Sequence, residues 1–595
     1  MKPGHLLSLA CLVTCTFADV TYNVVGYPDA PTGSFAVSID GTITKLATTD
    51  TTFPLWSGAV AGATGDKPYK YVKLDSNGSP ILQEDFVRSL ENSTAIQTRY
   101  DVFDREVTKF PLPDVPLVYA PWHSSKSKAF DDTVIATIHL VGDVNVFEAM
   151  LQAPEDALPM QVDFRYINDK LVHNVNNVTF GLSGKSSRDF QKMAFKFEFD
   201  TKNNQSFFKR PNIKLRSSSE DPTFSREKLQ IDMLNVVGIP TQQGAWVRLF
   251  MNSKPVGLYL MVDDIGKSFL KQTVHGGDKS IVRGSLWQMN APTVETQADL
   301  NYIDPLATNF CVDCYKMKNL GSNPVDAPMT QLIQFTKELQ AFNPNETGAI
   351  AYWEERADIE GILRNLAMEY LSSQWDAYWL SGSNYFMYFN PTMGPKGKWQ
   401  WIPTDFDGTF GNGDPYEKFV AYQTYADFTS HDRPLVSKLI LQNKDINARF
   451  EQIIKDIVGY AYKPEALFPR VDAYEKMLAK DAAWDYSIDR SRYPGKTNAW
   501  NASDFHDSFK QETKTMSFGI KPWIESRATE LQKQLQFTVV PGTPDRVKRP
   551  VRNPKGGKAD VADHGNGAES KVAPSLHSSA LVLLCVLVTI AGTMI

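Results

Sequence analysis

The chain has 595 residues, of which 42% are apolar and 22% charged, and its 62 lysine and arginine residues against 68 aspartate and glutamate residues give a net charge of −6. This composition excludes a chain that is disordered throughout, because its apolar surface can offset the entropy of folding. The mean hydropathy of −0.31 excludes a protein built mainly of membrane spans. The weak acidity argues against a nucleic-acid partner, which would need a basic face.

The first 18 residues have the layout of a secretory signal. Lys2 is followed by an apolar run over residues 6–13 and by small residues at Thr16 and Ala18. A charged start, an apolar centre and a small-residue end are typical of a signal peptide, here with cleavage before Asp19. The alternative is a buried N-terminal helix.

Residues 19–110 consist of short runs that alternate apolar and polar side chains, for example 20–25 and 69–74. Turn signals of the Asp-Gly and Asn-Gly type separate these runs, so the region is predicted to be an antiparallel β-sandwich module. The proline-rich segment 111–121 follows and is predicted to be a linker.

A loop rich in glycine and serine at 181–187, which includes Ser186, lies between two predicted strands. The backbone N–H groups of such a loop can contact phosphate, which makes the loop a candidate nucleotide-binding element. The alternative is a plain β-turn, since any hairpin can carry these residues.

A short strand at 212–216 precedes a predicted helix that has Asp221 as its N-cap and Pro222 at its first position. Glu227 lies near the start of this helix, so Lys214 of the strand and Glu227 of the helix can meet. Kinases use such a pair to fix a lysine on nucleotide phosphates. The alternative is a surface ion pair. Two further strands at 246–264 run into an acidic connector, as expected for a hinge between a β lobe and a helical lobe.

Two cysteines remain in the mature chain, because Cys11 and Cys15 lie in the signal and Cys585 lies in the C-terminal tail. These two, Cys311 and Cys314, are predicted to form a local disulfide in an oxidising compartment. A redox pair would be expected at a helix start after a strand, and a zinc site would need two more ligands.

The region after the connector is predicted to be largely helical, over 328–375 and 430–537. Between these ranges the sequence places Asp376, Asn384 and Asp405 in that order, with Asp407 two residues further on. Phosphoryl transfer needs a loop aspartate that orients and deprotonates the accepting hydroxyl, and an asparagine and a second aspartate that hold Mg²⁺. The sequence therefore predicts a phosphotransfer site.

The C-terminus has the layout of a glycosylphosphatidylinositol (GPI) attachment signal. Residues 538–566 are rich in proline, glycine and basic residues and are predicted to be a disordered stalk. Small residues at the end of the stalk, a polar spacer and an uncharged apolar tail predict attachment at Asn566 or Gly567 and removal of the remainder, 567–595. The alternative is a short transmembrane tail anchor.

Secretion is also consistent with six Asn-x-Ser/Thr sequons for N-glycosylation. Their asparagines are Asn77, Asn92, Asn177, Asn204, Asn345 and Asn501. The mature protein is thus expected on the extracellular face of the cell membrane, attached through a GPI anchor alone.

Several of these motifs together resemble the CotH family, which comprises bacterial spore-coat kinases and the CotH invasins of mucoralean fungi. The resemblance spans roughly residues 130–530. It is carried by the Gly-Leu-Ser-Gly-Lys-Ser-Ser loop, by Lys214-Leu-Arg with Arg226-Glu227, by Trp375-Asp376 with Asn384, and by Asp405-Phe-Asp407-Gly. It implies an α+β fold in which the β-sandwich module precedes an atypical two-lobe protein-kinase-like domain at 130–537, with ATP and Mg²⁺ as cofactors.

The resemblance also implies roles for single residues. Asp376 would be the catalytic aspartate and Asp405 the metal-binding aspartate, with Asn384 and Asp407 as helpers. Nucleotide-side residues would be Lys214 with Glu227, Lys192 as a rival lysine, and Ser186 in the loop. The expected activity is Mg-ATP-dependent phosphotransfer to serine or threonine of surface or coat proteins. The alternative is an invasin that binds a host-cell surface receptor.

A different enzyme class shares part of the pattern. Asp405-Phe-Asp407-Gly-Thr is similar to the motif of haloacid-dehalogenase-type phosphohydrolases, in which the first aspartate is a nucleophile. That fold needs alternating strands and helices after the motif. The helical pattern of 412–537 favours the kinase-like prediction.

Overall fold

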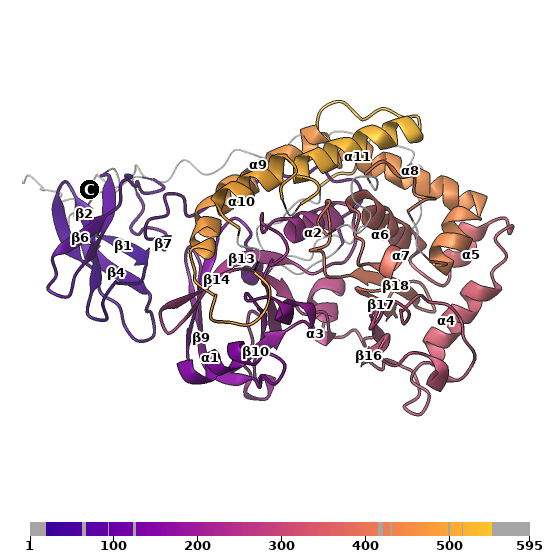
Figure 1. Cartoon of the computed structure of the whole chain (residues 1–595), viewed down its shortest axis with the longest axis horizontal. Helices are drawn as coiled ribbons and strands as arrows, with labels where there is room; N and C mark the ends of the chain where they lie inside the picture. Colours follow the sequence, from indigo (N-terminus) through magenta and orange to yellow (C-terminus); the bar gives the residue numbers. More distant parts are fainter. Residues whose placement is uncertain are drawn as a thin grey trace, which may run out of the picture. The chain divides into compact units, whose positions relative to one another are not determined.

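Residues 19–549 are the part of the chain that the computed structural model describes, except for short gaps at 62, 64–66, 93, 123–126, 414–420, 429–430, 498–499 and 515 (Figure 1). The predicted signal at 1–18 and the predicted GPI segment with Asn566 and Gly567 lie outside these residues. None of the described helices is long and apolar enough to cross a membrane. The described residues combine several β-sheets with helices, so the chain is an α+β protein.

Seven short strands near the N-terminus form two sheets that share one core, in the manner of a β-sandwich. The sheet orders are β4-β1-β7 and β3-β2-β5-β6. The strands are β1 Val20–Val25, β2 Ser34–Ile39, β3 Thr42–Lys45, β4 Leu55–Val60, β5 Tyr69–Leu74, β6 Pro80–Gln83 and β7 Asp101–Val102. Tyr22 and Phe35, one from each sheet, are fully buried in this core, because successive side chains of a strand point to opposite faces of its sheet. Asp40 and Gly41, both with positive φ, connect β2 to β3 in a tight hairpin.

A closed barrel of seven strands follows, in the order β10-β11-β12-β14-β13-β8-β9. Its strands are β8 Ala136–Val141, β9 Met160–Ile167, β10 Val172–Ser183, β11 Ala194–Glu198, β12 Asn212–Arg216, β13 Gly244–Met251 and β14 Lys254–Asp263. Neighbouring strands are antiparallel, except that β8 and β13 run parallel. Aromatic side chains such as Phe164, Phe180 and Phe197 fill the interior, and helix α1 (Val144–Gln152) adds Phe147 to the same core.

Strand β14 contributes to two cores at once. Tyr259 and Met261 belong to the barrel core, whereas Leu258 and Leu260 belong to the core that the barrel shares with the helices. The strand is therefore apolar on both faces. Helix α2 (Arg226–Val236) lies in the shared core, and ten of its eleven residues are buried. The shared core thus joins the barrel to the helical part of the chain.

The start of α2 corrects the prediction that Asp221 is the N-cap and Pro222 the first helical residue. Phe224 has a positive φ, which interrupts the helical backbone, and α2 begins only at Arg226. The Asp221 carboxylate still satisfies the helix start, since it accepts hydrogen bonds from the backbone N–H groups of Ser225 (3.0 Å) and Arg226 (2.9 Å). Asp221 thus acts as a cap from within the preceding turn.

The rest of the fold is a four-stranded antiparallel sheet, β16-β15-β17-β18, and the remaining helices, some of which pack against the barrel (Figure 1). The strands are β15 Leu286–Met289, β16 Tyr315–Asn319, β17 Tyr385–Asn390 and β18 Lys398–Pro403. The helices are α3 Lys267–Phe269, α4 Thr330–Ala341, α5 Ala349–Glu354, α6 Ile359–Ser372, α7 Tyr378–Ser381, α8 Lys444–Tyr460, α9 Pro464–Tyr486, α10 Ala502–Lys510 and α11 Ile520–Gln534. No strand beyond a single bridge occurs among the residues described after Asp405, which contradicts the phosphohydrolase alternative.

The two segments predicted as a linker and as the start of a stalk pack against the protein. Leu117 of the proline-rich segment 111–121 is buried, and its backbone N–H donates to the Asp545 carboxylate (2.8 Å). The Arg546 backbone N–H donates back to the Leu117 carbonyl (2.7 Å). The prediction of a disordered stalk is therefore wrong for 538–549, because these hydrogen bonds fix that segment. The rest of the predicted stalk, 550–566, lies outside the described residues.

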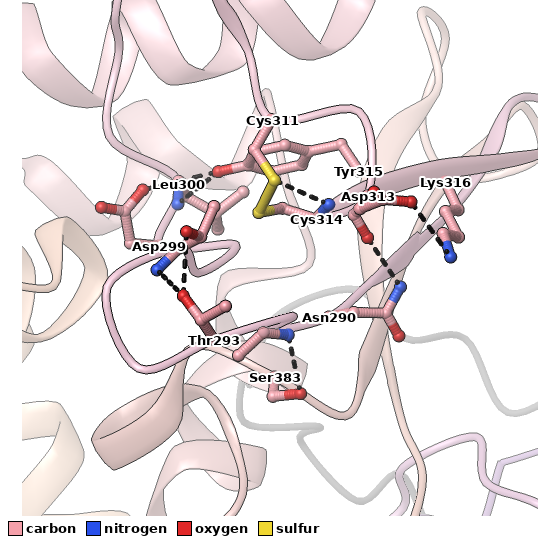
Figure 2. Close-up of a disulfide and its surroundings, with 12 residues drawn as sticks. Asn290, Thr293, Asp299, Leu300, Cys311, Asp313, Cys314, Tyr315, Lys316 and Ser383 are labelled. Carbon is pink, nitrogen blue, oxygen red and sulfur yellow. Dashed lines mark hydrogen bonds and ion pairs between the residues drawn. A yellow bond between two sulfur atoms is a disulfide. The ribbon is translucent and has the colours of Figure 1, made fainter. Parts of the chain in front are cut away.

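Cys311 and Cys314 are joined in a disulfide, the local pairing that the sequence indicates (Figure 2). Cys314 is buried in the shared core, and its backbone N–H donates to the Cys311 sulfur (3.0 Å). The disulfide closes the turn that leads into β16. All six sequon asparagines are exposed, in the sandwich, the barrel and the helical part alike.

Candidate active site

Two predicted site residues come together because two strands of the antiparallel sheet end side by side. Asn384 immediately precedes β17, and Asp405 follows β18 by two residues. The strands pair so that Tyr385 lies opposite Pro403, and the Thr404 backbone N–H donates to the Asn384 carbonyl (3.1 Å). This register places the polar residues at the end of β18 beside those before β17.

Asp376 reaches the same place from the end of helix α6. The helix stops at Ser372 because Ser373 adopts a left-handed conformation. Asn384 then holds Asp376, since its side-chain amide donates both to the Asp376 carboxylate (2.8 Å) and to the Asp376 backbone carbonyl (2.7 Å). Burial, and after it the negative charge of Asp405, raise the pKa of Asp376 to about 7. The Asn384 hydrogen bond opposes this rise.

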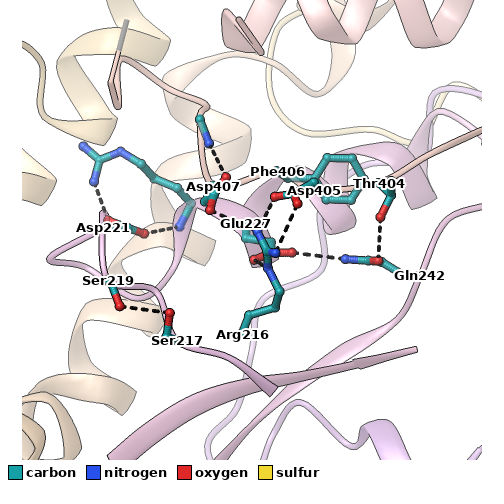
Figure 3. A network of polar contacts seen from close by, with 12 residues as sticks. Arg216, Ser217, Ser219, Asp221, Glu227, Gln242, Thr404, Asp405, Phe406 and Asp407 are labelled. Atoms are coloured by element: carbon teal, nitrogen blue, oxygen red, sulfur yellow. Dashed lines mark hydrogen bonds and ion pairs between the residues drawn. The ribbon is translucent and has the colours of Figure 1, made fainter. Parts of the chain in front are cut away.

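A single guanidinium, that of Arg216, joins the carboxylates (Figure 3). Its Nε donates to Glu227 (3.0 Å), its Nη1 donates to Asp405 (3.1 Å), and its Nη2 contacts both Asp405 and Asp407 (3.0 Å to Asp407). Arg216 comes from the barrel strand β12, Glu227 from helix α2, and the two aspartates from the loop after β18. The site is therefore assembled from the barrel, the shared core and the antiparallel sheet.

The predicted pair of Lys214 and Glu227 does not form. Ile213 and Leu215 belong to the barrel core, so Lys214 and Arg216 both point outward on the other face of β12. Of these two, Arg216 contacts Glu227, whereas Lys214 pairs with Asp264 (2.7 Å). Sequence alternation indicates which residues share a face, but it does not decide which of them meets the helix.

The rival lysine and the loop serine also lie elsewhere. Lys192 is largely buried, where it pairs with Asp485 of α9 (3.0 Å) and donates to the Leu258 carbonyl (2.7 Å). Burial lowers the pKa of Lys192 to about 8. Ser186 is exposed and begins a short 3₁₀ helix, Ser186–Asp189, so the predicted loop is more than a plain β-turn. Among the contacts of the described residues, none joins Lys192 or Ser186 to the carboxylates of the site.

Glu227 is fixed from its other side by two residues that sequence analysis did not identify. The Gln242 amide donates to Glu227 (3.1 Å), and the Thr404 hydroxyl donates to the Gln242 amide oxygen (3.1 Å). Burial raises the pKa of Glu227, and Arg216 opposes this rise. Gln374, just after α6, donates to the Asp405 backbone carbonyl (3.2 Å). No motif pointed to Gln242, Thr404 or Gln374, because their positions depend on contacts distant in sequence.

The donor chemistry of the site suits a hard divalent cation. Three carboxyl groups, those of Asp405, Asp407 and Glu227, contact one arginine, and the carboxyl group of Asp376 is near Asp405. Oxygen ligands are those that Mg²⁺ prefers. Partial burial and the adjacent Asp405 raise the pKa of Asp407, as expected where negative charge is in excess. Within the described residues, no set of three or more His, Cys, Asp or Glu side chains is already arranged around a metal position. Arg216 instead engages the two aspartates.

The chain is similar to a family model and to several known proteins. A family model described as CotH kinase protein matches residues 181–531. Invasin CotH3 of Rhizopus delemar is 28% identical over 559 residues, which cover 90% of this chain and 88% of that protein. Invasin CotH2 of the same organism is also 28% identical, with 94% and 91% covered. Inner spore coat protein H of Bacillus subtilis is 21% identical over 308 residues, 51% of this chain and 76% of that protein.

Proposed function

The chain belongs to the CotH kinase protein family, and from this membership and the geometry of the site we propose that it is an atypical protein kinase of the cell surface. It would transfer a phosphoryl group from Mg-ATP to a serine or threonine hydroxyl of a surface or coat protein. The observation that carries the proposal is that Asp376 and Asn384 lie beside the loop that carries Asp405 and Asp407, whose carboxylates share the Arg216 guanidinium with Glu227. The two lobes would be the barrel with α2 and the sheet with its helices.

In this proposal Asp376 receives the proton of the accepting hydroxyl. Its pKa of about 7 suits a group that takes and returns a proton near neutral pH. Asn384 fixes the Asp376 carboxylate through the 2.8 Å hydrogen bond and so sets the direction from which the hydroxyl can approach. Asp405, Asp407 and Asn384 would hold Mg²⁺, which supplies positive charge to the phosphates when it is bound.

The activity is tested with the purified secreted chain, Mg²⁺ and ATP labelled in the γ-phosphate. We expect phosphate incorporation into the chain itself or into an added coat protein, and its loss in Asp405→Ala and Asp376→Ala. Asp29→Ala is the matched control, since Asp29 lies on the N-terminal sandwich with its side chain 66% exposed. Incorporation by the unaltered chain no greater than that by Asp405→Ala would refute the kinase proposal.

A second candidate function is invasion, because relatives named invasins match about nine-tenths of both chains. In this role the surface would bind a receptor on a host cell, with or without phosphotransfer. Loss of the gene, or an antibody against the chain, is then expected to reduce host-cell uptake. Uptake that does not change would contradict the invasin role, and normal uptake with Asp405→Ala would separate it from catalysis.

The proposed place of the protein is the outer face of the cell membrane, as a GPI-anchored glycoprotein. The signal-like residues 1–18, the tail at 567–595 and six exposed sequons support this proposal. A phospholipase specific for phosphatidylinositol should release the protein from intact cells, and a glycosidase for N-linked glycans should lower its mass. Retention on the cell after phospholipase treatment would favour a transmembrane tail instead.

A further inference from the structure

Arg216 has a position that is unusual for a structural ion pair. Its side chain is 20% exposed, and it contacts three carboxylates that come from two distant parts of the chain. A guanidinium has five N–H donors in a fixed plane, and here donors at Nε, Nη1 and Nη2 all point to carboxylate oxygens. The positive charge of Arg216 thus lies between the carboxylates of Asp405 and Asp407.

The side chain is held in this place from the Glu227 side. Glu227 is 6% exposed, binds Nε of Arg216 and is itself held by Gln242, which Thr404 holds in turn. Thr404 directly precedes Asp405, so the chain of hydrogen bonds returns to the aspartate that Arg216 contacts. Such a closed network fixes the guanidinium more firmly than a single surface ion pair would.

The charges around Arg216 do not balance. Three carboxylates, those of Glu227, Asp405 and Asp407, face one positive charge, and Asp376 is close enough for Asp405 to raise its pKa. A divalent cation would offset the remaining negative charge. It would also need the same Asp405 and Asp407 oxygens that Arg216 engages, because these are the oxygen donors at the end of β18.

We propose that Arg216 is a positioning residue that substitutes for the divalent cation: it keeps Asp405 and Asp407 together before the metal binds and competes with the metal for their oxygens. The inference rests on the proposed function, since it concerns the same Mg²⁺ site. Arg216 remains attached to Glu227 when the metal takes the aspartates. The competition weakens binding of the metal alone, so that metal binding depends on the further phosphate ligands of the nucleotide.

The test compares metal binding by the unaltered secreted chain, Arg216→Gln and Arg216→Lys, with Mn²⁺ alone as the probe, followed by electron paramagnetic resonance. Removal of the competing charge is expected to tighten Mn²⁺ binding by about tenfold or more in Arg216→Gln. Arg216→Lys keeps one charge but loses the planar fork, so its affinity should lie between the other two. Equal or weaker binding by Arg216→Gln would overturn the inference.

A second measurement covers the case in which Arg216→Gln disturbs the fold. Without metal this variant should melt at a lower temperature than the unaltered chain, and Mg²⁺ alone should raise its melting temperature by more. Arg449→Gln is the matched control, because Arg449 pairs with Glu360 at 2.7 and 2.8 Å with similar exposure and joins α8 to α6. That control should melt lower without a larger response to Mg²⁺. An equal response of both variants would overturn the inference.

The outcomes separate this inference from the proposed function. Phosphate transfer by the unaltered chain, combined with unchanged Mn²⁺ binding in Arg216→Gln, would refute only the role of Arg216. Tight Mn²⁺ binding by Arg216→Gln, combined with no phosphate transfer by the unaltered chain, would refute only the kinase. Absence of Mn²⁺ binding in every version would overturn the role of Arg216, whereas the kinase proposal is decided by the phosphate-transfer assay.

Discussion

Glu369 should make the stability of this protein fall as the pH rises. It lies in helix α6, only 2% exposed, and accepts hydrogen bonds from the Trp379 backbone N–H (3.0 Å) and the Asn365 amide (2.8 Å). Burial raises its pKa to about 8, from an ordinary value of 4.5. The Asn365 amide oxygen has no partner among the described residues. If that amide is turned over, a protonated Glu369 can donate to its oxygen.

The direction and size of the effect follow from proton linkage. Between pH 4.5 and about 8 the folded state keeps a proton that the unfolded state has lost, so folding stability decreases with pH in this window. The slope is about 1.4 kcal/mol per pH unit, and the loss sums to about 5 kcal/mol across the window. Below pH 4.5 Glu369 is protonated in both the folded and the unfolded state, so it no longer makes the folding stability depend on pH.

Replacement Glu369→Gln tests this reasoning, because glutamine is neutral and similar in size. Its stability relative to the unaltered chain should increase by about 1.4 kcal/mol per pH unit between pH 5 and 8, as measured by urea unfolding at four pH values. Glu360→Gln is the control: Glu360 lies in the same helix but is partly exposed and bound to Arg449. A difference between Glu369→Gln and the unaltered chain that is constant over this pH range would refute the argument.

Two further predictions concern the fold around the site. Asp221→Ala should lower the free energy of unfolding by about 3–5 kcal/mol, as measured in urea, because it leaves the fully buried Arg226 without its carboxylate partner (2.6 Å). A decrease of less than about 1 kcal/mol would contradict the role of Asp221 in capping α2 and pairing with Arg226. Replacement of both Cys311 and Cys314 by serine should cost about 2 kcal/mol, since the closed loop is short. An unchanged melting temperature under oxidising conditions, with the unaltered chain as reference, would show that the disulfide contributes nothing.

Local patterns were sufficient for several elements. The Asp40-Gly41 turn, the short N-terminal strands and the pairing of Cys311 with Cys314 depend on residues close in sequence, and the structure has all three. The order of Asp376, Asn384 and Asp405 along the chain was enough to indicate where a polar site would form. The start of α2 does not follow from local patterns, because residue types give no sign of the positive φ at Phe224.

The sequence by itself determined the α+β class and the family, and its motifs indicated the acidic residues that the structure brings together. Only the tertiary structure decided that Arg216 rather than Lys214 meets Glu227. Both residues point outward from β12, and their contacts depend on how the barrel packs against α2 and the loop after β18. The same reason applies to residues 538–549, whose composition suggests disorder. Their hydrogen-bond partners are distant in sequence: Leu117 lies more than 400 residues earlier, and Gly459 and Lys463 lie about 80 residues earlier.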